Sequence, residues 1–246
     1  MARSVQSRES IVTRNALGSI FAAIALALAG CASAAPPAAS TIVDAAPEPE
    51  RIDTGPTFYE TETGGLNEDD MSDAFRALQR PLQRCMDQGI SRLAPLGGHL
   101  KLTMRIQRDG AAKWVYLSES TIGDRETEKC VLDLARGKTW PRPVGGEGMA
   151  SKTFDIDPSA EPDEWDAKKV KPTIAQARTQ TAKCRRGVRG TFTATAYVRP
   201  DGRVLSAGVA PPDEKGEDVA DCVVDAILKV RFKKHGGKAA KVSFEI

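Results

Sequence analysis

The sequence contains few of the residues, and none of the motifs, that most enzymes use for catalysis. Only two histidines occur, His99 and His235, and each stands near glycine in an expected loop. No nucleophile-elbow, zinc-protease, phosphate-loop or dinucleotide-binding pattern occurs. No pair of carboxylates is placed for acid–base chemistry. The sequence therefore predicts a protein that is not an enzyme, with no metal, no cofactor and no small-molecule substrate.

The sequence also lacks an apolar run long enough to cross a membrane. Its most apolar stretch, residues 16–30, has 15 residues, whereas a transmembrane helix needs about 20. Three arginines precede it, Arg3, Arg8 and Arg14. A basic start before a short apolar run is typical of a secretory signal, so residues 1–30 are predicted to be a signal peptide.

The residues Leu28-Ala29-Gly30-Cys31 resemble the lipobox of bacterial lipoproteins. In that class of protein the cysteine receives a diacylglycerol, the chain is cut before it, and the new N-terminus is acylated, commonly with palmitate. The resemblance implies that Cys31 is the lipid attachment site. Because Ala32 follows rather than aspartate, it also implies anchorage in the outer membrane, facing the periplasm. An ordinary cleaved signal and an uncleaved anchor are the alternatives.

The charges of the exported chain are balanced. Residues 1–30 contain three arginines and one glutamate, so the 35 basic and 33 acidic residues of the whole chain become 32 of each after cleavage. A balanced chain has no electrostatic basis for general nucleic-acid binding, which depends on cationic contacts to phosphates. We therefore expect no nucleic-acid partner.

Two segments are predicted to be linkers. Residues 31–67 are rich in alanine, proline, glutamate and threonine and contain few large apolar side chains. Such a composition buries too little apolar surface to fold, so we expect a disordered spacer. Residues 157–170 are acidic and then basic, and are expected to be a second linker.

The rest of the chain reads as two copies of one unit, residues 68–156 and 171–246, which we call the first and second repeat. Each repeat contains an Asp-Gly pair, at residues 109–110 and 201–202, and a cysteine 20 residues after that glycine. A second cysteine of each repeat follows an apolar residue, Phe75 or Ile174, by 10 residues. Unrelated domains would rarely share these offsets, and repetition at a fixed spacing indicates a duplicated architecture.

Each repeat has the pattern helix, hairpin, helix, strand. Apolar residues at helical spacing around Phe75 predict the first helix, with a kink or a late start at Pro81. Strict alternation from Leu100 to Ile106 predicts an antiparallel strand with one wet face, and Asp-Gly predicts the hairpin turn. A right-handed crossover places the third strand beside the first. The predicted fold class is α+β, with two tandem αββαβ units, each a three-stranded antiparallel sheet (order 2-1-3) with two helices on one face.

Two segments of the first repeat, STIGDRETEKCVLDLARGKTWPRP and IQRDG, resemble the AgmX/PglI C-terminal domain of myxobacterial-type envelope proteins. That domain is similar to the TonB C-terminal domain. The resemblance covers residues 71–156 and, more loosely, residues 172–246, where APPDEKGEDVADC replaces the usual Ser-Ser-Thr stretch. It implies docking of an envelope protein partner in a motility or envelope complex, by addition of an extended strand to the third strand's open edge. It does not imply energy coupling, because no inner-membrane helix is present to transmit force.

Four cysteines remain after Cys31, one on each helix of each repeat, and all on the face expected to look toward the sheet. Two helices side by side bring such positions within disulfide range, and export permits oxidation. We therefore predict the disulfides Cys85–Cys130 and Cys184–Cys222. Buried free thiols are an alternative, as is a zinc site, although the chain has no C-x2-C pair of the kind zinc usually uses.

The second repeat carries two basic runs that form a candidate patch for an anionic partner. The patch residues are Lys183, Arg185, Arg186, Arg189, Lys229, Arg231, Lys233 and Lys234, and the second run continues to Lys238 and Lys241. A solvated helix end with its loop is the alternative explanation. The sequence thus supports a membrane-anchored, non-enzymatic envelope lipoprotein that acts as a protein-interaction module. The alternative function is binding of peptidoglycan or another anionic envelope polymer through the second repeat.

Overall fold

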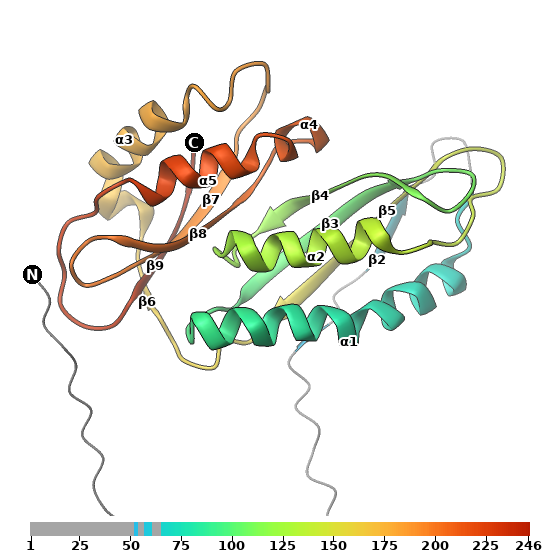
Figure 1. Cartoon of the computed structure of the whole chain (residues 1–246), viewed down its shortest axis with the longest axis horizontal. Coiled ribbons are helices and arrows are strands. Elements are labelled where there is room, and N and C mark those ends of the chain that lie inside the picture. Colours follow the sequence, from blue (N-terminus) through green and yellow to red (C-terminus); the bar gives the residue numbers. More distant parts are fainter. Residues whose placement is uncertain (1–51, 54–56, 61–64) are drawn as a thin grey trace, which may run out of the picture. The chain divides into compact units, whose positions relative to one another are not determined.

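Both repeats follow the element order helix, hairpin, helix, strand, so the fold class is α+β as predicted (Figure 1). The computed structural model describes residues 52–53, 57–60 and 65–246, all of which belong to one compact unit, Glu48–Ile246. Cys31 and the expected signal peptide lie outside the described residues.

The first repeat begins with helix α1 (Glu68–Arg92), which starts where the sequence supplies a cap. The side chain of Asn67 accepts a hydrogen bond from the backbone N–H of Asp70 at 2.9 Å, and acidic residues fill the first turn. Both features stabilise the positive end of a helix. The helix begins at Glu68 and continues through Pro81, so the expected late start at Pro81 is wrong.

Strands β3 (Gly98–Ile106) and β4 (Ala112–Ser120) form the predicted hairpin. Gly110 at its turn has φ +89°, and a Cβ there would lie 2.3 Å from the carbonyl oxygen of Trp140. The turn therefore requires glycine. The ladder shifts register twice, between Lys101 and Leu102 and between Arg105 and Ile106, and shifts of this kind are typical of β-bulges.

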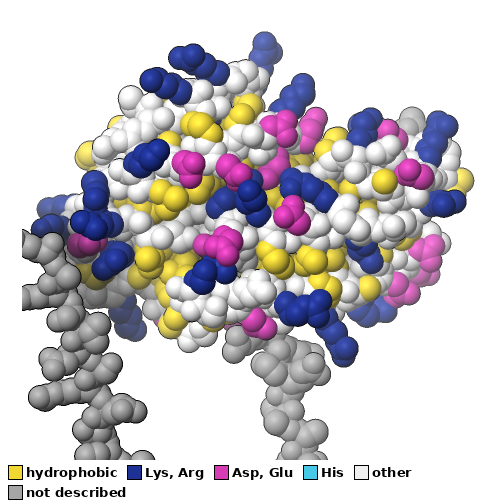
Figure 2. All heavy atoms as spheres, viewed as in Figure 1, with side chains coloured by type: hydrophobic (Ala, Val, Ile, Leu, Met, Phe, Trp, Pro, Cys, Tyr) yellow, Lys and Arg dark blue, Asp and Glu magenta, His cyan; other side chains and the backbone are white. Residues whose placement is uncertain are grey.

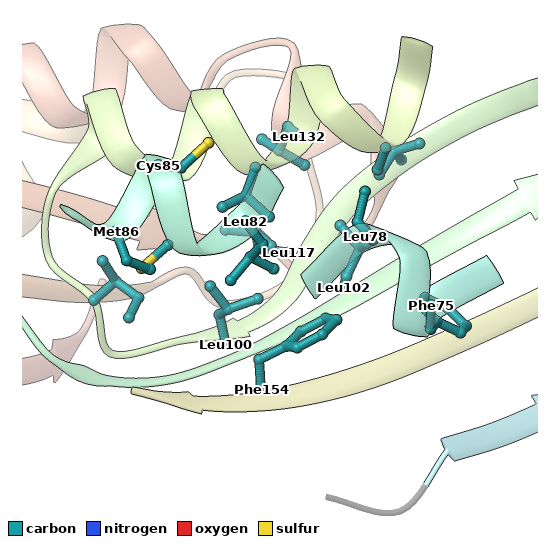
Figure 3. Close-up of a cluster of buried hydrophobic side chains, with 14 of the residues drawn as sticks. Phe75, Leu78, Leu82, Cys85, Met86, Leu100, Leu102, Leu117, Leu132 and Phe154 are labelled. Atoms are coloured by element: carbon teal, nitrogen blue, oxygen red, sulfur yellow. The ribbon is translucent and has the colours of Figure 1, made fainter. Parts of the chain in front are cut away.

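Helix α2 (Arg125–Gly137) and strand β5 (Gly148–Ile156) complete the first repeat. β5 pairs with β3 in antiparallel orientation, so the sheet order is β4-β3-β5, the predicted 2-1-3. Figure 3 shows the core between the helices and the sheet. Phe75, Leu78 and Leu82 of α1 lie over Leu102 and other apolar side chains of the sheet, and all are buried.

The second repeat contains helix α3 (Lys171–Thr181), strands β7 (Thr193–Val198) and β8 (Val204–Ala210), helices α4 (Glu214–Glu217) and α5 (Ala220–Leu228), and strand β9 (Ala240–Glu245). Its sheet has the same order, β8-β7-β9, with antiparallel pairs. The single second helix that the sequence predicts is divided into α4 and α5. Thr103 pairs with Ser151 in the first sheet, and Thr195 pairs with Ser243 in the second. From the first strand of each sheet onward, residue n of the first repeat is therefore equivalent to residue n + 92 of the second.

Parts of both expected linkers are ordered strands, which differs from the prediction of plain spacers. Within residues 31–67, β1 (Ile52–Asp53) and β2 (Thr57–Glu60) pair with β5 in antiparallel orientation. Within residues 157–170, β6 (Asp163–Glu164) pairs with β9 in parallel orientation and the 3-10 helix η1 (Ala167–Val170) follows. A strand edge has unpaired backbone groups that favour such additions even from segments with little apolar content.

The helix-free face of the second sheet is buried, so the expectation of a wet face is wrong for this repeat. Thr195 and Tyr197 point to that face and are fully buried. The hydroxyl of Tyr197 donates to the carbonyl oxygen of Pro95 in the first repeat at 2.9 Å. Gly123 of the first repeat also lies against this face of the second sheet, since a Cβ there would be 2.9 Å from the side chain of Thr195. Loops of the first repeat thus cover the face that the sequence pattern assigned to water.

Candidate functional site

The structure contains both disulfides at the pairing that the sequence predicts. Cys85 is bonded to Cys130, with their Cα atoms 5.8 Å apart, and Cys184 is bonded to Cys222, with their Cα atoms 5.6 Å apart. Each bond joins the first helix of a repeat to the second. No group of residues among those described could hold a metal ion in their place.

The basic residues of the candidate anionic-partner patch lie in two separate places. Lys183, Arg185, Arg186 and Arg189 follow α3, next to the disulfide at the start of α5, whereas Lys229, Arg231, Lys233 and Lys234 follow the end of α5. Cys222, beside the first group, and Lys229 are seven residues apart along α5, which is about 10 Å. Lys241 is buried and donates to the carbonyl oxygen of Gly97 at 3.0 Å, so it belongs to no surface patch. Figure 2 shows acidic and basic side chains interspersed on the face in view.

The outer edge of β5, where the sequence places strand addition, is occupied in the first repeat. Phe58 of β2 pairs with Ser151, and Asp53 of β1 pairs with Asp155. The chain thus adds its own N-terminal segment to the third strand of the first repeat. The edge cannot accept another strand while this segment is bound.

The equivalent edge of β9 is vacant at Ser243 and partly occupied on either side of it. β6 pairs only with Ala240 and Lys241. The outward carbonyl of Lys241 accepts from the N–H of Trp165 at 2.8 Å, and that of Glu245 accepts from Nε of Arg178 at 3.1 Å. Because backbone groups alternate along a strand, the N–H and C=O of Ser243 also point outward. Among the described residues, no strand pairs with Ser243 on this side.

A groove of about 500 Å³ runs along this vacant edge. Its apolar floor includes Ile174 of α3 and Phe244 of β9, both of which are part of the second core. Lys168, Lys171 and Arg178 also line the groove. Glu245 is the one acidic residue of this lining, so its net charge is positive. An open strand edge beside an apolar floor and a basic rim can bind an extended peptide through backbone pairing and side-chain contacts.

The remaining sheet edges, β4 and β8, are partly closed by side chains of α2. The carboxylate of Glu128 accepts a hydrogen bond from the backbone N–H of Val209 on β8 at 3.2 Å. The guanidinium of Arg136 donates to the carbonyl oxygen of Val115 on β4 at 3.4 Å. Side chains that occupy edge groups in this way reduce the capacity of both strands to pair with another chain.

Equivalent positions of the two repeats carry opposite charges and meet at their junction. Arg125 and Glu217 are equivalent positions, and their side chains form an ion pair at 2.7 Å. Lys129 and Asp221 are also equivalent and pair at 2.9 Å. Arg125 bonds Asp221 as well, at 2.7 Å. Helix α2 of the first repeat thus carries cations where it faces the anions of α4 and α5 in the second.

A fully buried carboxylate lies at the same junction. Glu128 accepts from Oγ of Ser120 at 2.7 Å, in addition to the N–H of Val209. A Cβ on Gly208 would lie 2.2 Å from its Oε1, so only glycine leaves room for it. Burial raises the pKa of Glu128 to about 7, although its hydrogen bonds and Arg125 act in the opposite direction. At neutral pH the group is near its midpoint and binds or releases a proton over a narrow pH range.

Sequence reasoning missed the junction because its residues carry no local signal. Glu128 stands in an amphipathic helix among charged neighbours, and its burial depends on the second repeat. The one usable sign was the comparison of the repeats, since Glu128 aligns with Ala220 and Gly208 aligns with Tyr116. At these two positions one repeat has a charged residue where the other has alanine, or a glycine where the other has an aromatic residue. Such differences indicate positions that have different roles in the two repeats.

No family model matches this chain, and neither a curated protein nor a solved structure matches it. The class of this protein is therefore described by its architecture alone. The described residues form two tandem αββαβ repeats with one disulfide in each. Among these residues, no helix is long and apolar enough to cross a membrane.

Proposed function

We propose that this chain is a non-enzymatic envelope lipoprotein, anchored through Cys31 in the outer membrane and facing the periplasm, that binds a protein partner by strand addition. The partner contributes an extended segment that pairs with β9 of the second repeat at Ser243. The first repeat supplies the stable platform, because its own third strand already holds β2.

The observation that supports this proposal is the difference between two equivalent serines. Ser151 in β5 is paired with Phe58 of β2. Ser243 in β9 occupies the same position of the second sheet, and its outward backbone groups face the groove lined by Ile174 and Arg178. The first repeat thus illustrates the binding mode, and the second repeat offers the same edge to another chain.

The character of the groove favours a segment with apolar and acidic residues. Ile174 and Phe244 provide the apolar floor, while Lys168, Lys171 and Arg178 stand on one side. Complementary charge steers association and selects among partners more than it adds affinity. A partner segment with alternate apolar residues facing the floor and a carboxylate near the rim fits these contacts.

A proline substitution tests the proposal, because proline lacks the backbone N–H that a partner strand would use. Ser243→Pro removes the outward N–H and leaves the bonds of Val242 and Phe244 to β7 in place. Ser243→Ala is the matched control, since it removes only the hydroxyl, which lies on the opposite face near Thr195. A photo-crosslinker at Ala175, in the groove, reports contact in the native envelope.

We expect one discrete crosslinked partner with the unsubstituted chain and with Ser243→Ala, and none with Ser243→Pro. A crosslinker at Arg76, on the exposed face of α1, should give no such product. An unchanged product with Ser243→Pro would contradict strand addition at this edge.

A second candidate function is binding of peptidoglycan or another anionic envelope polymer. The exposed group Lys229, Arg231, Lys233 and Lys234 at the end of α5 favours it. Charge reversal at Lys233 and Lys234 should abolish sedimentation with purified peptidoglycan, because clustered cations supply the attraction. Retention by the reversed variant at the level of the unsubstituted chain would remove this candidate.

A further inference from the structure

A second cleft lies over the junction of the two repeats, apart from the strand groove. It has a volume of about 400 Å³. Its charged lining is divided by repeat: the first repeat contributes only cations and the second only anions. The lining residues are Lys113, Trp114, Val115, Arg125, Lys129 and Arg136 from the first repeat, and Glu214, Glu217, Asp218 and Asp221 from the second.

Ion pairs across the junction use only part of this charge. Arg125 pairs with Glu217 and Asp221, and Lys129 also pairs with Asp221. Arg136 lies 3.6 Å from Glu217. Glu214 and Asp218 have no ion-pair partner within 4.0 Å among the described residues of the chain. The acidic wall therefore keeps two carboxylates available at the cleft.

Two buried polar atoms of the lining also lack partners. Nη1 of Arg125 and Oε2 of Glu217 have no hydrogen bond within the part of the chain that the structure describes. The side chain of Glu217 is 6% exposed and that of Arg125 is 11% exposed. A buried polar atom without a hydrogen-bond partner is costly in a folded protein, even where the rest of its group is paired. One of these atoms is a donor and the other an acceptor, and both belong to side chains that line the cleft.

We propose that this cleft binds a small zwitterion of the amino-acid class, with its carboxylate toward Arg125 and Arg136 and its ammonium group toward Glu217 and Asp218. The volume is at the low end of the range for ligand sites, which is roughly 300–1,000 Å³. That size suits one amino acid or a dipeptide. Trp114 supplies an apolar surface for the side chain. A bound ligand contacts both repeats at once and so stabilises their junction.

Three probes that differ only in charge test this proposal: L-alanine, N-acetyl-L-alanine, which lacks the ammonium group, and L-alaninamide, which lacks the carboxylate. Titrations of the purified chain are followed by amide chemical shifts of residues at the cleft. We expect alanine to bind and each blocked analogue to bind at least about tenfold more weakly, because each leaves one wall without its charged partner.

Variants at the rim of the cleft separate ligand contacts from folding. Arg136 and Asp218 are exposed enough that Arg136→Gln and Asp218→Asn should leave the fold intact. Each should weaken alanine binding by about tenfold, the effect of one lost charged contact. The matched controls are Arg76→Gln and Asp73→Asn, an exposed ion pair on α1, and should bind alanine as the unsubstituted chain does.

Two results would overturn the proposal. One is equal binding of the three probes, which would show that the charges of the walls do not select the ligand. The other is no binding of any probe, which would show that the cleft takes no ligand of the amino-acid class. Neither result bears on the groove at β9, since that site shares no lining residue with this cleft.

Discussion

The two repeats have the same fold but use the same sheet edge differently. In the first repeat, β1 and β2 cover the outer edge of β5, and in the second, β6 covers only the beginning of β9. The helix-free faces differ as well, because loops of the first repeat bury Tyr197 of the second. The two repeats thus have the same sheet, and the contacts that each sheet makes with neighbouring segments determine which surface stays open.

The cores of the repeats differ in the size of their side chains. The first core contains leucine, methionine and phenylalanine at most buried positions of its helices and strands. The second core has alanine at several equivalent places, namely Ala177, Ala194, Ala196 and Ala207. Since apolar burial contributes in proportion to area, the second repeat depends more on its disulfide and on the junction.

The largest effect expected from a substitution comes from the disulfides. Replacing both cysteines of Cys184–Cys222 with alanine should lower the free energy of unfolding by up to about 4 kcal/mol, because the bond closes a long loop in the unfolded chain. The same change at Cys85–Cys130 should cost a similar amount, but the first repeat has a larger core to offset it. Calorimetry should therefore show a lower melting temperature for the variant of the second repeat, and the reverse order would contradict the comparison of the cores.

Charge reversal at the junction is the next largest effect. Arg125→Glu or Glu217→Arg alone should destabilise the chain by about 3 kcal/mol, because each leaves a buried charge beside a like charge. The double variant should recover about half of that loss, since the opposite charges meet again while Asp221 then faces a glutamate. Denaturant unfolding of the four chains measures the coupling. If the double variant lost as much stability as the two single variants together, Arg125 and Glu217 would not interact.

The buried Glu128 should make stability depend on pH near neutrality. Its pKa is about 7 in the folded chain, above the ordinary value of about 4.3 for glutamate. Between these values the folded state holds a proton that the unfolded state has lost, so stability decreases as pH rises toward 7. Glu128→Gln, which imitates the protonated form, should be more stable at pH 8 by about 2 kcal/mol and should show a smaller pH dependence. A steeper pH dependence for this variant would contradict the account.

The smallest of these effects concerns the glycine that makes room for Glu128. Gly208→Ala places a Cβ against the carboxylate and should cost about 1.5 kcal/mol through overpacking. Gly236→Ala is the control, because no atom lies within 4 Å of the Cβ position there; it should change stability by less than about 0.5 kcal/mol. Thermal unfolding compares the two variants, and equal losses would show that the junction tolerates the added methyl group.

Much of the architecture could be predicted from local patterns. The helical spacing around Phe75, the alternation of β3 and the Asp-Gly turn fixed the elements, and a right-handed crossover fixed the sheet order. The disulfides followed from the positions of the cysteines on facing helices. These features depend on contacts within one repeat, where spacing in the sequence determines position in space.

The interactions between segments could not be predicted in the same way. Nothing local indicates that Tyr197 enters the first core or that β2 pairs with β5. A strand such as Thr57–Glu60 is stabilised by the edge it joins rather than by its own composition. The open groove at β9 depends on the same kind of contact, because the extent of β6 decides how much of the edge remains free.

Amide hydrogen exchange of two residues tests the central claim most directly. The N–H groups of Ser151 and Ser243 are equivalent and both point to the outer side of the third strand, but among the described residues only Ser151 has a strand on that side. Backbone hydrogen bonds protect amides from exchange in proportion to the stability of the paired structure. We predict slow exchange at Ser151 and fast exchange at Ser243 in the free chain. Equal protection at both residues would contradict a filled edge in the first repeat and a vacant one in the second.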